Sequence, residues 1–222
     1  MLKRLTDILL SIIIILLSLP VICIILLIVF LIMLENPLVF QIRKITLDKN
    51  EVKIIKIRTI KSSQELIDFE NKCSNIFIKE GLEQSVPVFC RWLRKTGIDE
   101  IPQIINVLKG EMSLIGPRPF PIHDLNLLKT CTPEFYNRRR KINSKPGITG
   151  YWQVYGNRQF GTVNLIECDE IYENESSFFF DLKIISRTIF VLFTAKHSDA
   201  LIHLKPVKKL SYISNNTIFI ES

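Results

Sequence analysis

Two adjacent carboxylates and one arginine are the residues whose types and spacing best suit a chemical reaction. Asp99 and Glu100 stand together, and Arg118 follows between two prolines. Carboxylates can bind metal ions and attack phosphorus, while an arginine can donate two hydrogen bonds at once to the oxygens of one phosphate. The proline after Arg118 favours an extended backbone there, which presents the guanidinium on a stiff support. The set suits a metal-bound phosphate ester.

A short helix is expected to position the two carboxylates, from about Asp99 to Gly110. Apolar residues at 101, 104, 105 and 108 have the spacing of one buried helical face, and Pro102 is tolerated in a first turn. Asp99 and Glu100 would then lie where free backbone N–H groups and the helix dipole attract phosphate. The plainer interpretation is that Asp99 caps the helix, that Glu100 favours its dipole, and that Arg118 is a surface ion-pair residue.

Length, net charge and the spacing of cysteine and histidine limit what the chain can be. Its 222 residues leave room for one domain and an appendage, and 29 basic against 22 acidic residues give a net charge of +7. Such a basic surface could serve nucleic acid, anionic lipid or phosphorylated substrates. The cysteines form no C-x-x-C pair and the histidines no metal-ligand spacing, which argues against a zinc site.

A long apolar run near the N-terminus predicts entry into a membrane. Residues 8–34 carry no charge, and the run is too long for the roughly 7–15-residue core of a signal peptide. A straight helix of this length, about 40 Å, exceeds the roughly 30 Å hydrocarbon core. Ser18 and Pro20 lie near its middle, so a tilted, kinked span and a re-entrant hairpin both remain open. Basic residues on both flanks favour re-entry from the cytoplasmic side.

Local patterns predict the remaining elements. Strands are expected at 37–41, 52–57 and 112–116, a loop at 145–153, and helices at 63–80, 123–129, 133–141, 160–172 and 176–194. Lys56 and Arg58 would share one side of a strand, as a solvated face or as a contact for phosphate or lipid headgroups. The basic run 138–141 is expected to be solvated, to complement a helix end, or to grip anionic headgroups. The last helix, with Lys183 and Arg187 among many apolar residues, suits the membrane interface.

Several motifs along the chain occur together in one known family. They are Lys3-Arg4 with Asp7, Ser18-x-Pro20, Phe40-Gln41-x-Arg43, Lys56-x-Arg58-Thr59, Leu93-Arg94-Lys95-Thr96-x-x-Asp99-Glu100-x-Pro102-Gln103, the run 106–119, Pro146-Gly147-Ile148-Thr149-Gly150, Asp169-x-x-Tyr172-x-Asn174-x-Ser176 and Asp181-Leu182. On these residues the sequence resembles the monotopic phosphoglycosyl transferases, bacterial sugar transferases that start lipid-linked glycan assembly.

The resemblance implies an architecture and a place in the cell. The fold would be α/β, a small mixed α+β domain with interfacial amphipathic helices and an N-terminal re-entrant membrane helix. Residues 1–36 would form the anchor, 37–195 the catalytic domain and 196–222 a tail of unknown role. The chain would be the short form of the family, without further spans or a preceding domain. It would lie at the cytoplasmic face of the bacterial inner membrane.

The resemblance also implies an activity. The family transfers a sugar phosphate from a UDP-sugar to undecaprenyl phosphate with Mg²⁺, through a phosphoryl-aspartate intermediate. Carried over, Asp99 is the nucleophile and Glu100 its partner, and both would hold Mg²⁺. Lys56, Arg58, Arg94 and Arg118 would bind substrate phosphates. Anionic lipid would be a further partner and nucleic acid would not.

Some segments depart from the family pattern. Residues 46–50 stand where glycines are usual, residues 83–87 replace an Asp-x-Arg-x-Thr segment, and Cys90 stands where Gly is common. These departures concern nucleotide or sugar contacts and leave the carboxylate pair unchanged. Two other classes remain open: a membrane-tethered basic binding protein, which could lose Asp99 and Glu100 freely, and a membrane-attached phosphohydrolase, which would need no lipid phosphate.

Overall fold

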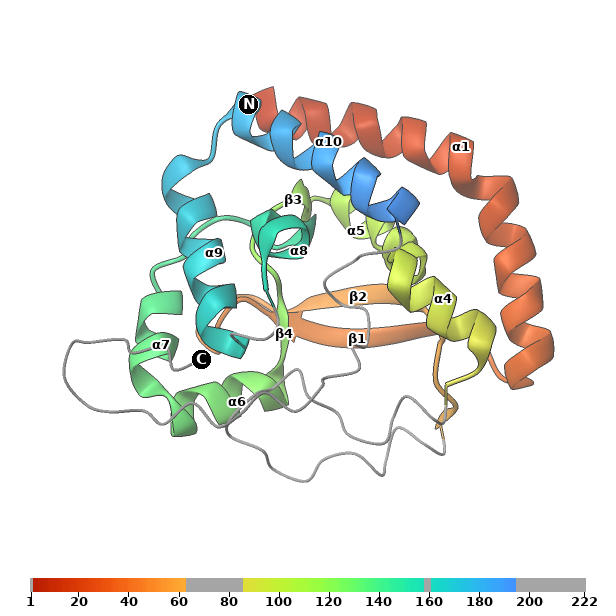
Figure 1. Cartoon of the computed structure of the whole chain (residues 1–222), viewed down its shortest axis with the longest axis horizontal. Coiled ribbons are helices and arrows are strands. Elements are labelled where there is room, and N and C mark those ends of the chain that lie inside the picture. The colour runs from red at the N-terminus through yellow and green to blue at the C-terminus, as the bar shows by residue number, and fades with distance from the viewer. Residues whose placement is uncertain (1, 63–85, 158–160, 195–222) are drawn as a thin grey trace, which may run out of the picture.

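Helices make up most of the chain that the computed structural model describes, namely residues 2–62, 86–157 and 161–194. They surround two small sheets, so the expected mixed α+β architecture is confirmed (Figure 1). The helix expected at 63–80 and the tail from 196 onward lie outside the described residues.

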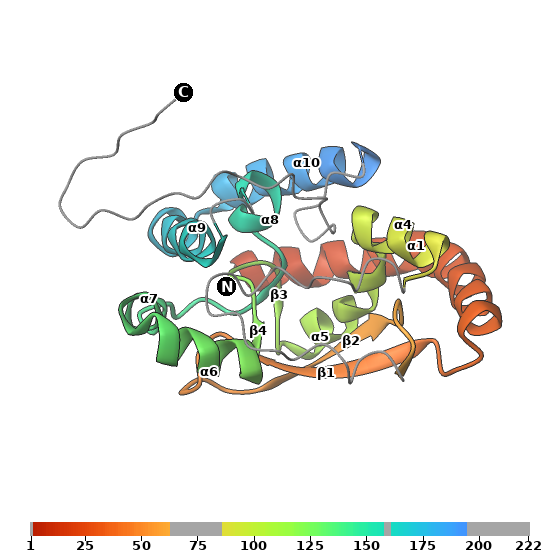
Figure 2. The same ribbon diagram turned by 60° about the horizontal axis from the view of Figure 1, so that its bottom comes forward.

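The larger sheet is built on an antiparallel hairpin. Strands β1 (Leu38–Lys44) and β2 (Val52–Ile57) pair along their length, and the short β4 (Phe120–Pro121) joins the other edge of β1. The strand expected at 52–57 is confirmed, and the strand expected at 37–41 continues to Lys44. The turned view places this hairpin and α10 on opposite sides of the molecule (Figure 2).

The smaller sheet brings two distant segments together through glycine. Strand β3 (Ser113–Ile115) runs parallel to β5 (Gly147–Thr149). A Cβ added at Gly116 would lie 2.2 Å from the carbonyl oxygen of Lys145, and one added at Gly147 would lie 2.1 Å from the nitrogen of Gly116. The loop expected at 145–153 is therefore wrong in part, because glycine permits close strand contact as well as turns.

The helices follow the chain in a simple order. After α1 they are α4 (Val88–Thr96), the 3₁₀ helix η1 (Ile98–Gln103), α5 (Ile104–Lys109), α6 (Ile122–Cys131), α7 (Pro133–Arg139), α8 (Tyr151–Tyr155), α9 (Gly161–Glu175) and α10 (Phe178–Thr194). Apart from bounds that differ by a few residues, α6, α7, α9 and α10 are the helices expected from the sequence.

Three apolar clusters form the core. One joins β2, α5 and β3 to α9 and α10 through residues such as Ile54, Val107 and Ile184. A second joins α6, α7, α8 and α9 around Trp152 and Leu165. The third joins the end of α1 to α4 and β2. The segment from η1 to β3 therefore lies between the hairpin and the C-terminal helices.

Helix α1 (Leu2–Met33) is continuous and contains Pro20. Its ribbon turns partway along (Figure 1), as expected where proline removes a backbone donor. Both of its ends rest on the same domain: Asp7 and Ser11 are buried near the start, and Ile25, Val29 and Met33 near the end. Within the described residues it is the one helix long and apolar enough to cross a membrane.

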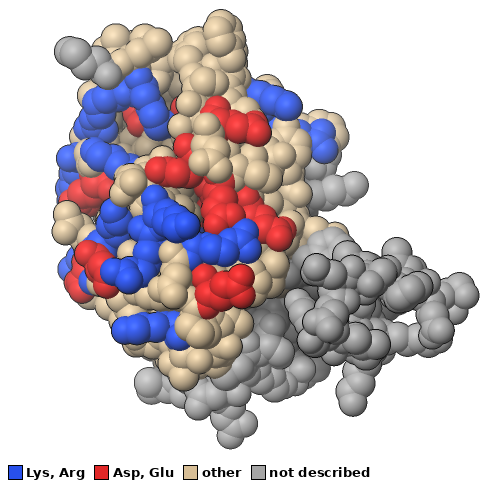
Figure 3. All heavy atoms as spheres, turned by 90° about the vertical axis from the view of Figure 1, so that its left-hand side faces the viewer, with Lys and Arg blue, Asp and Glu red and all other residues tan. Residues whose placement is uncertain are grey.

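Many large apolar side chains of α1 and α10 are exposed. They include Leu16, Leu17, Leu19, Leu27 and Leu31 of α1 and Phe178, Phe179, Leu182, Ile189 and Phe190 of α10. Lys, Arg, Asp and Glu side chains cover the middle of one face and also reach its upper part, whereas its top edge carries uncharged residues (Figure 3). The two helices together present an extensive apolar surface.

Candidate active site

The carboxylate pair lies on η1, directly after a sharp turn. Gly97 ends α4 and precedes η1 with φ of 75°, a conformation that favours glycine. Asp99 and Glu100 are 7% and 6% exposed. Because Gly97 occupies the cap position of η1, the interpretation of Asp99 as a helix cap is wrong.

The expected helix from Asp99 to Gly110 is two elements. The chain is 3₁₀ through Gln103, and α-helix begins only at Ile104. Ile104 is buried as expected, whereas Ile105 is 43% exposed, because the 3₁₀ turns shift the buried face. The carboxylates therefore do not lie at the N-terminus of an α-helix, and the dipole argument for phosphate binding does not apply. Gly110, with φ of 84°, ends α5 as expected.

Lys56 reaches the carboxylate pair from the hairpin. Val52, Ile54 and Lys56 alternate along β2 and so share the face that packs against η1 and α5. Lys56 forms an ion pair with Glu100, and the two side chains are 13% and 8% exposed. The sequence placed Lys56 among the phosphate-binding candidates, and the structure puts it beside the expected catalytic residues.

Arg94 approaches the same region from the last turn of α4. Its Nη1 donates to the hydroxyl of Thr59 over 3.1 Å. Burial raises the pKa of the Cys90 thiol, the charge of Arg94 lowers it, and the charge of Asp99 raises it further. Arg94 and Asp99 therefore both lie near enough to Cys90, in the first turn of α4, to affect its thiol.

Arg58 lies elsewhere. It donates to the backbone oxygen of Asn36 and to the hydroxyl of Ser62, both over 2.8 Å, and forms an ion pair of 3.3 Å with Glu35. Because β2 ends at Ile57, the period of two no longer keeps Arg58 on the side of Lys56. Its contacts join the residues that follow α1 to the end of the hairpin, and they do not include the carboxylate pair.

Arg118 lies on the turn between the two sheets, after β3 and before β4. Its backbone N–H donates to Asp169 over 3.4 Å, and its carbonyl accepts from Arg139. The prolines on either side restrict the turn further. The expected stiff support for the guanidinium is therefore present, and residues far along the chain complete it.

The basic run 138–141 does not behave as one unit. Arg138 pairs with Glu170 and Arg140 pairs with Asp48, both at the surface. Arg139 is 0% exposed and pairs with Asp169, which is 1% exposed. The expectation of a solvated or headgroup-binding run is wrong for Arg139, since charge alone does not tell which residue of a helix faces inward.

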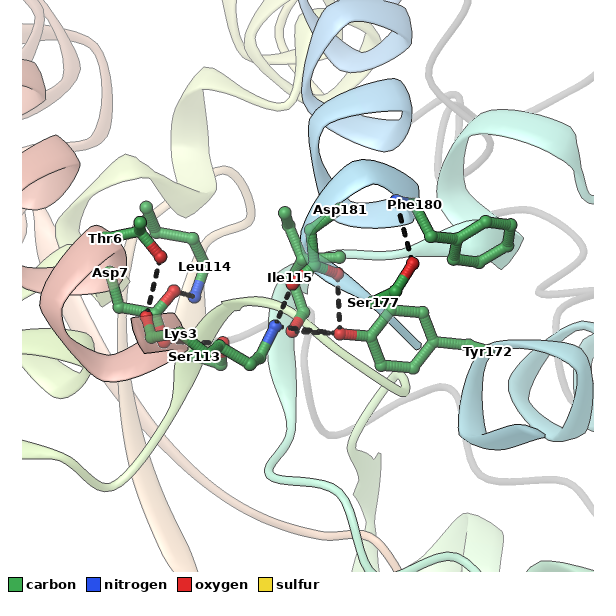
Figure 4. Close-up of polar contacts among 10 residues, drawn as sticks. All are labelled: Lys3, Thr6, Asp7, Ser113, Leu114, Ile115, Tyr172, Ser177, Phe180 and Asp181. Atoms are coloured by element: carbon green, nitrogen blue, oxygen red, sulfur yellow. Dashed lines mark hydrogen bonds and ion pairs between the residues drawn. The ribbon is translucent and has the colours of Figure 1, made fainter. Parts of the chain in front are cut away.

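A buried polar network attaches the start of α1 to the segment that carries the site. Asp7 accepts from the hydroxyl of Ser113 over 2.7 Å and from the N–H of Leu114 over 3.1 Å. Lys3 donates to Tyr172 over 2.9 Å and pairs with Asp181 over 2.6 Å. Figure 4 shows how α1, β3, α9 and α10 meet through these side chains. Only the family motifs indicate Asp7 in the sequence, because the groups that it bonds lie more than a hundred residues away.

The carboxylate pair has the chemistry of a partial magnesium site. The described residues contain no group of three or more His, Cys, Asp or Glu that could hold a metal. Mg²⁺ that acts on phosphates typically takes only one or two carboxylates and completes its shell with phosphate oxygens and water. The adjacent, nearly buried Asp99 and Glu100 fit that donor set.

Comparison with known proteins gives one family. The pattern of the bacterial sugar transferase family matches residues 1–195. A UDP-glucose:undecaprenyl-phosphate glucose-1-phosphate transferase of Escherichia coli is 35% identical over 88% of this chain, and the galactosyl transferase CpsE of Streptococcus agalactiae is 31% identical over 71%. An undecaprenyl-phosphate galactose phosphotransferase of Salmonella typhimurium is 38% identical over 44%. These matches span 41%, 35% and 19% of the relatives' own lengths.

Proposed function

The chain belongs to the bacterial sugar transferase family, and we propose that it transfers a sugar phosphate from a UDP-sugar to undecaprenyl phosphate. Relatives are named for this reaction with glucose or galactose as the sugar. The product would be the first lipid-linked intermediate of a bacterial surface glycan, and one relative is named as an exopolysaccharide production protein.

The reaction divides into two displacements at one phosphorus. In the first, a carboxylate oxygen of Asp99 attacks the sugar-linked phosphorus of the UDP-sugar, and the bond to the bridging oxygen breaks to release UMP. In the second, an oxygen of undecaprenyl phosphate attacks the same phosphorus, and the bond to Asp99 breaks to restore the carboxylate. Covalent catalysis of this kind replaces one difficult transfer by two easier ones.

The observation that carries the proposal is the placement of the Asp99–Glu100 pair. Both carboxylates are nearly buried, Lys56 pairs with Glu100, and the charge of Arg94 acts in the same region as that of Asp99. Lys56 and Arg94 would bind diphosphate oxygens beside the nucleophile, and Arg118 would bind them from its rigid turn. Arg58, which contacts Glu35 and Asn36, would instead hold the residues after α1 against the end of the hairpin. Bound Mg²⁺ would neutralise charge on the diphosphate and stabilise the leaving group.

The attachment of α1 supports a re-entrant anchor at the cytoplasmic face. A helix that crossed the bilayer could keep only one end against a domain on one side. Here the start contacts β3 through Asp7, and the end contacts β2 and α4 through Val29 and its neighbours. The bend that contains Pro20, with Ser18 before it, would be the point of return. The exposed apolar residues of α10 would lie in the interface, where undecaprenyl phosphate is found.

The function is tested with purified protein, undecaprenyl phosphate, Mg²⁺ and a panel of UDP-sugars, scored by UMP release. Transfer predicts UMP release and a lipid-linked sugar phosphate for at least one sugar. Sugar phosphate released to water without lipid acceptor, at the full rate, would indicate a phosphohydrolase. No release with any UDP-sugar would indicate a binding protein.

The anchor is tested by cysteine labelling in whole cells. Leu2 is the first residue of α1 and Leu34 follows its last; they are 59% and 77% exposed. Each can be replaced by cysteine without breaking the ion pairs of Lys3 or Glu35. Re-entry predicts that an impermeant thiol reagent labels neither position until the cells are lysed. Labelling of one position from outside would show a spanning helix, and the protein with its native cysteines alone gives the background.

A further inference from the structure

The turn that carries Arg118 is held through both of its backbone polar groups by one buried ion pair. Asp169 accepts from the N–H of Arg118, and Arg139 donates to its carbonyl. The same two side chains pair with each other over 2.6 Å. Arg139 comes from α7 and Asp169 from α9, so two helices meet on the backbone of a single residue.

Arg139 also contacts segments other than the Arg118 turn and α9. Its Nε donates to the carbonyl of Ile45 over 2.7 Å, at the end of the hairpin, and its guanidinium lies 4.3 Å from the centre of the Phe120 ring. One buried side chain thus joins the hairpin, the Arg118 turn and α9. The planar, five-donor guanidinium suits this task, whereas a lysine ammonium could not make the same set of bonds.

Helix α9 holds the other end of the same segment. Tyr172 lies one turn after Asp169 and so on the same face of the helix. Its hydroxyl donates to the carbonyl of Ile115 over 3.1 Å (Figure 4). The four residues from Ile115 to Arg118 are therefore fixed at both ends by buried side chains of one helix.

Stability alone does not require a buried ion pair at this position. Removing two charges from water is costly, and well-packed apolar residues often stabilise a fold as well as a buried ion pair does. Burial raises the pKa of Asp169 to about 6 and lowers that of Arg139, so both groups bear that cost. What the pair provides, and apolar residues could not, is directional bonding to the two peptide groups of Arg118.

We propose that Arg139, together with Asp169, is a positioning residue that sets the direction of the Arg118 side chain toward the substrate phosphates. The inference rests on the proposed function, in which Arg118 binds the diphosphate of the UDP-sugar. Arg139 does not touch substrate and acts only through the backbone of Arg118. Its effect on the reaction should therefore depend on Arg118 being present.

The test is a double-mutant cycle of Arg139→Lys and Arg118→Ala. Arg139→Lys keeps the charge beside Asp169 and loses the contact to the Arg118 carbonyl. We expect it to raise KM for the UDP-sugar about tenfold, with a smaller change in kcat, since misplacement of a binding group weakens substrate positioning. In the Arg118→Ala background the same substitution should change KM less than about twofold.

Arg138→Lys is the matched control, because the neighbouring arginine pairs with Glu170 at the surface. It should leave KM and kcat unchanged. If Arg139→Lys does not fold, the double variant Arg139→Gln with Asp169→Asn, which leaves no buried charge unpaired, enters the same cycle. Thermal unfolding and circular dichroism establish folding for each protein.

The outcomes separate the inference from the function on which it rests. Equal effects of the Arg139 substitution with and without Arg118 would overturn the inference, since the residue would then act independently. An Arg118→Ala variant with unchanged KM would overturn it as well. A wild-type protein that releases no UMP from any UDP-sugar would overturn the proposed function and this inference together.

Discussion

Two ion pairs, Lys56–Glu100 and Arg139–Asp169, use the same chemistry for different ends. The second is completely enclosed, with side chains 0% and 1% exposed, and its members bond to the backbone of two other segments, at Ile45 and at Arg118. The first is 13% and 8% exposed and adjoins a second carboxylate, Asp99. Asp169 has a strongly raised pKa, yet it belongs to the pair that we assign to positioning. A perturbed pKa therefore does not identify the reacting carboxylate by itself.

The largest effect on activity is expected when Asp99, the proposed nucleophile beside the Lys56–Glu100 pair, is replaced. Asp99→Asn preserves shape, so we expect the fold to persist while turnover falls by about 10³-fold or more, as when other nucleophiles are removed. With radiolabelled UDP-sugar, Mg²⁺ and no lipid acceptor, the wild type should release UMP in a burst and retain label, and the variant should do neither. Asp48→Asn, at a surface carboxylate, is the control. Near wild-type turnover by Asp99→Asn would end the assignment.

Lys56→Met tests whether the more accessible pair takes part in the reaction. It removes a cation that would face the diphosphate, so we expect kcat to fall about 10²-fold. Lys53→Met is the control, because Lys53 lies on the exposed face of the same strand. Loss of stability without loss of activity per folded molecule would show that Lys56–Glu100 is a purely structural ion pair.

The pH dependence of stability examines the enclosed pair. The pKa of Asp169 is about 6 when folded, against a value of 3.8 for an ordinary Asp. Between these values the unfolded chain has lost the proton that the folded protein keeps, so the contribution of Asp169 to stability falls as pH rises. The free energy of unfolding of the wild type, measured relative to Asp169→Asn, should decrease from about pH 4 to about pH 6 and then level off. An increase across that window would show a lowered pKa.

The smallest effect is expected far from both pairs, on α10. Phe179 and Ile189 are 80% and 50% exposed, and replacing both by Ser should weaken interfacial binding. We expect transfer to lipid acceptor to fall by a few-fold. Full burial of such an apolar side chain contributes about 1.5–3 kcal/mol, and partial burial at the interface contributes less. UMP release in the first step should not change. Ile42→Ser, on the opposite hairpin, is the control, and an equal loss there would contradict an interfacial role for α10.

Features that depend on neighbouring residues could be predicted from the amino-acid sequence. A charge-free run of this length has to be helical in a membrane, and it is one continuous helix here. The period of two along 52–57 indicates which side chains of that strand share a face, and local pattern indicated the presence of α6, α7, α9 and α10. The adjacency of Asp99 and Glu100 is a property of the sequence, and so is the pairing of Arg118 with two prolines.

Which charged residues contact one another depends on the folded arrangement of distant segments. Arg58 and Lys56 are two residues apart, yet one contacts Glu35 and the other Glu100. Arg139 stands among three other basic residues and is the buried one, because Asp169, thirty positions later, faces it. Residues 145–153 were expected to form a loop, yet Gly147 begins strand β5, which packs closely against Gly116, directly after β3. Such contacts depend on the packing of distant segments, which local pattern does not encode.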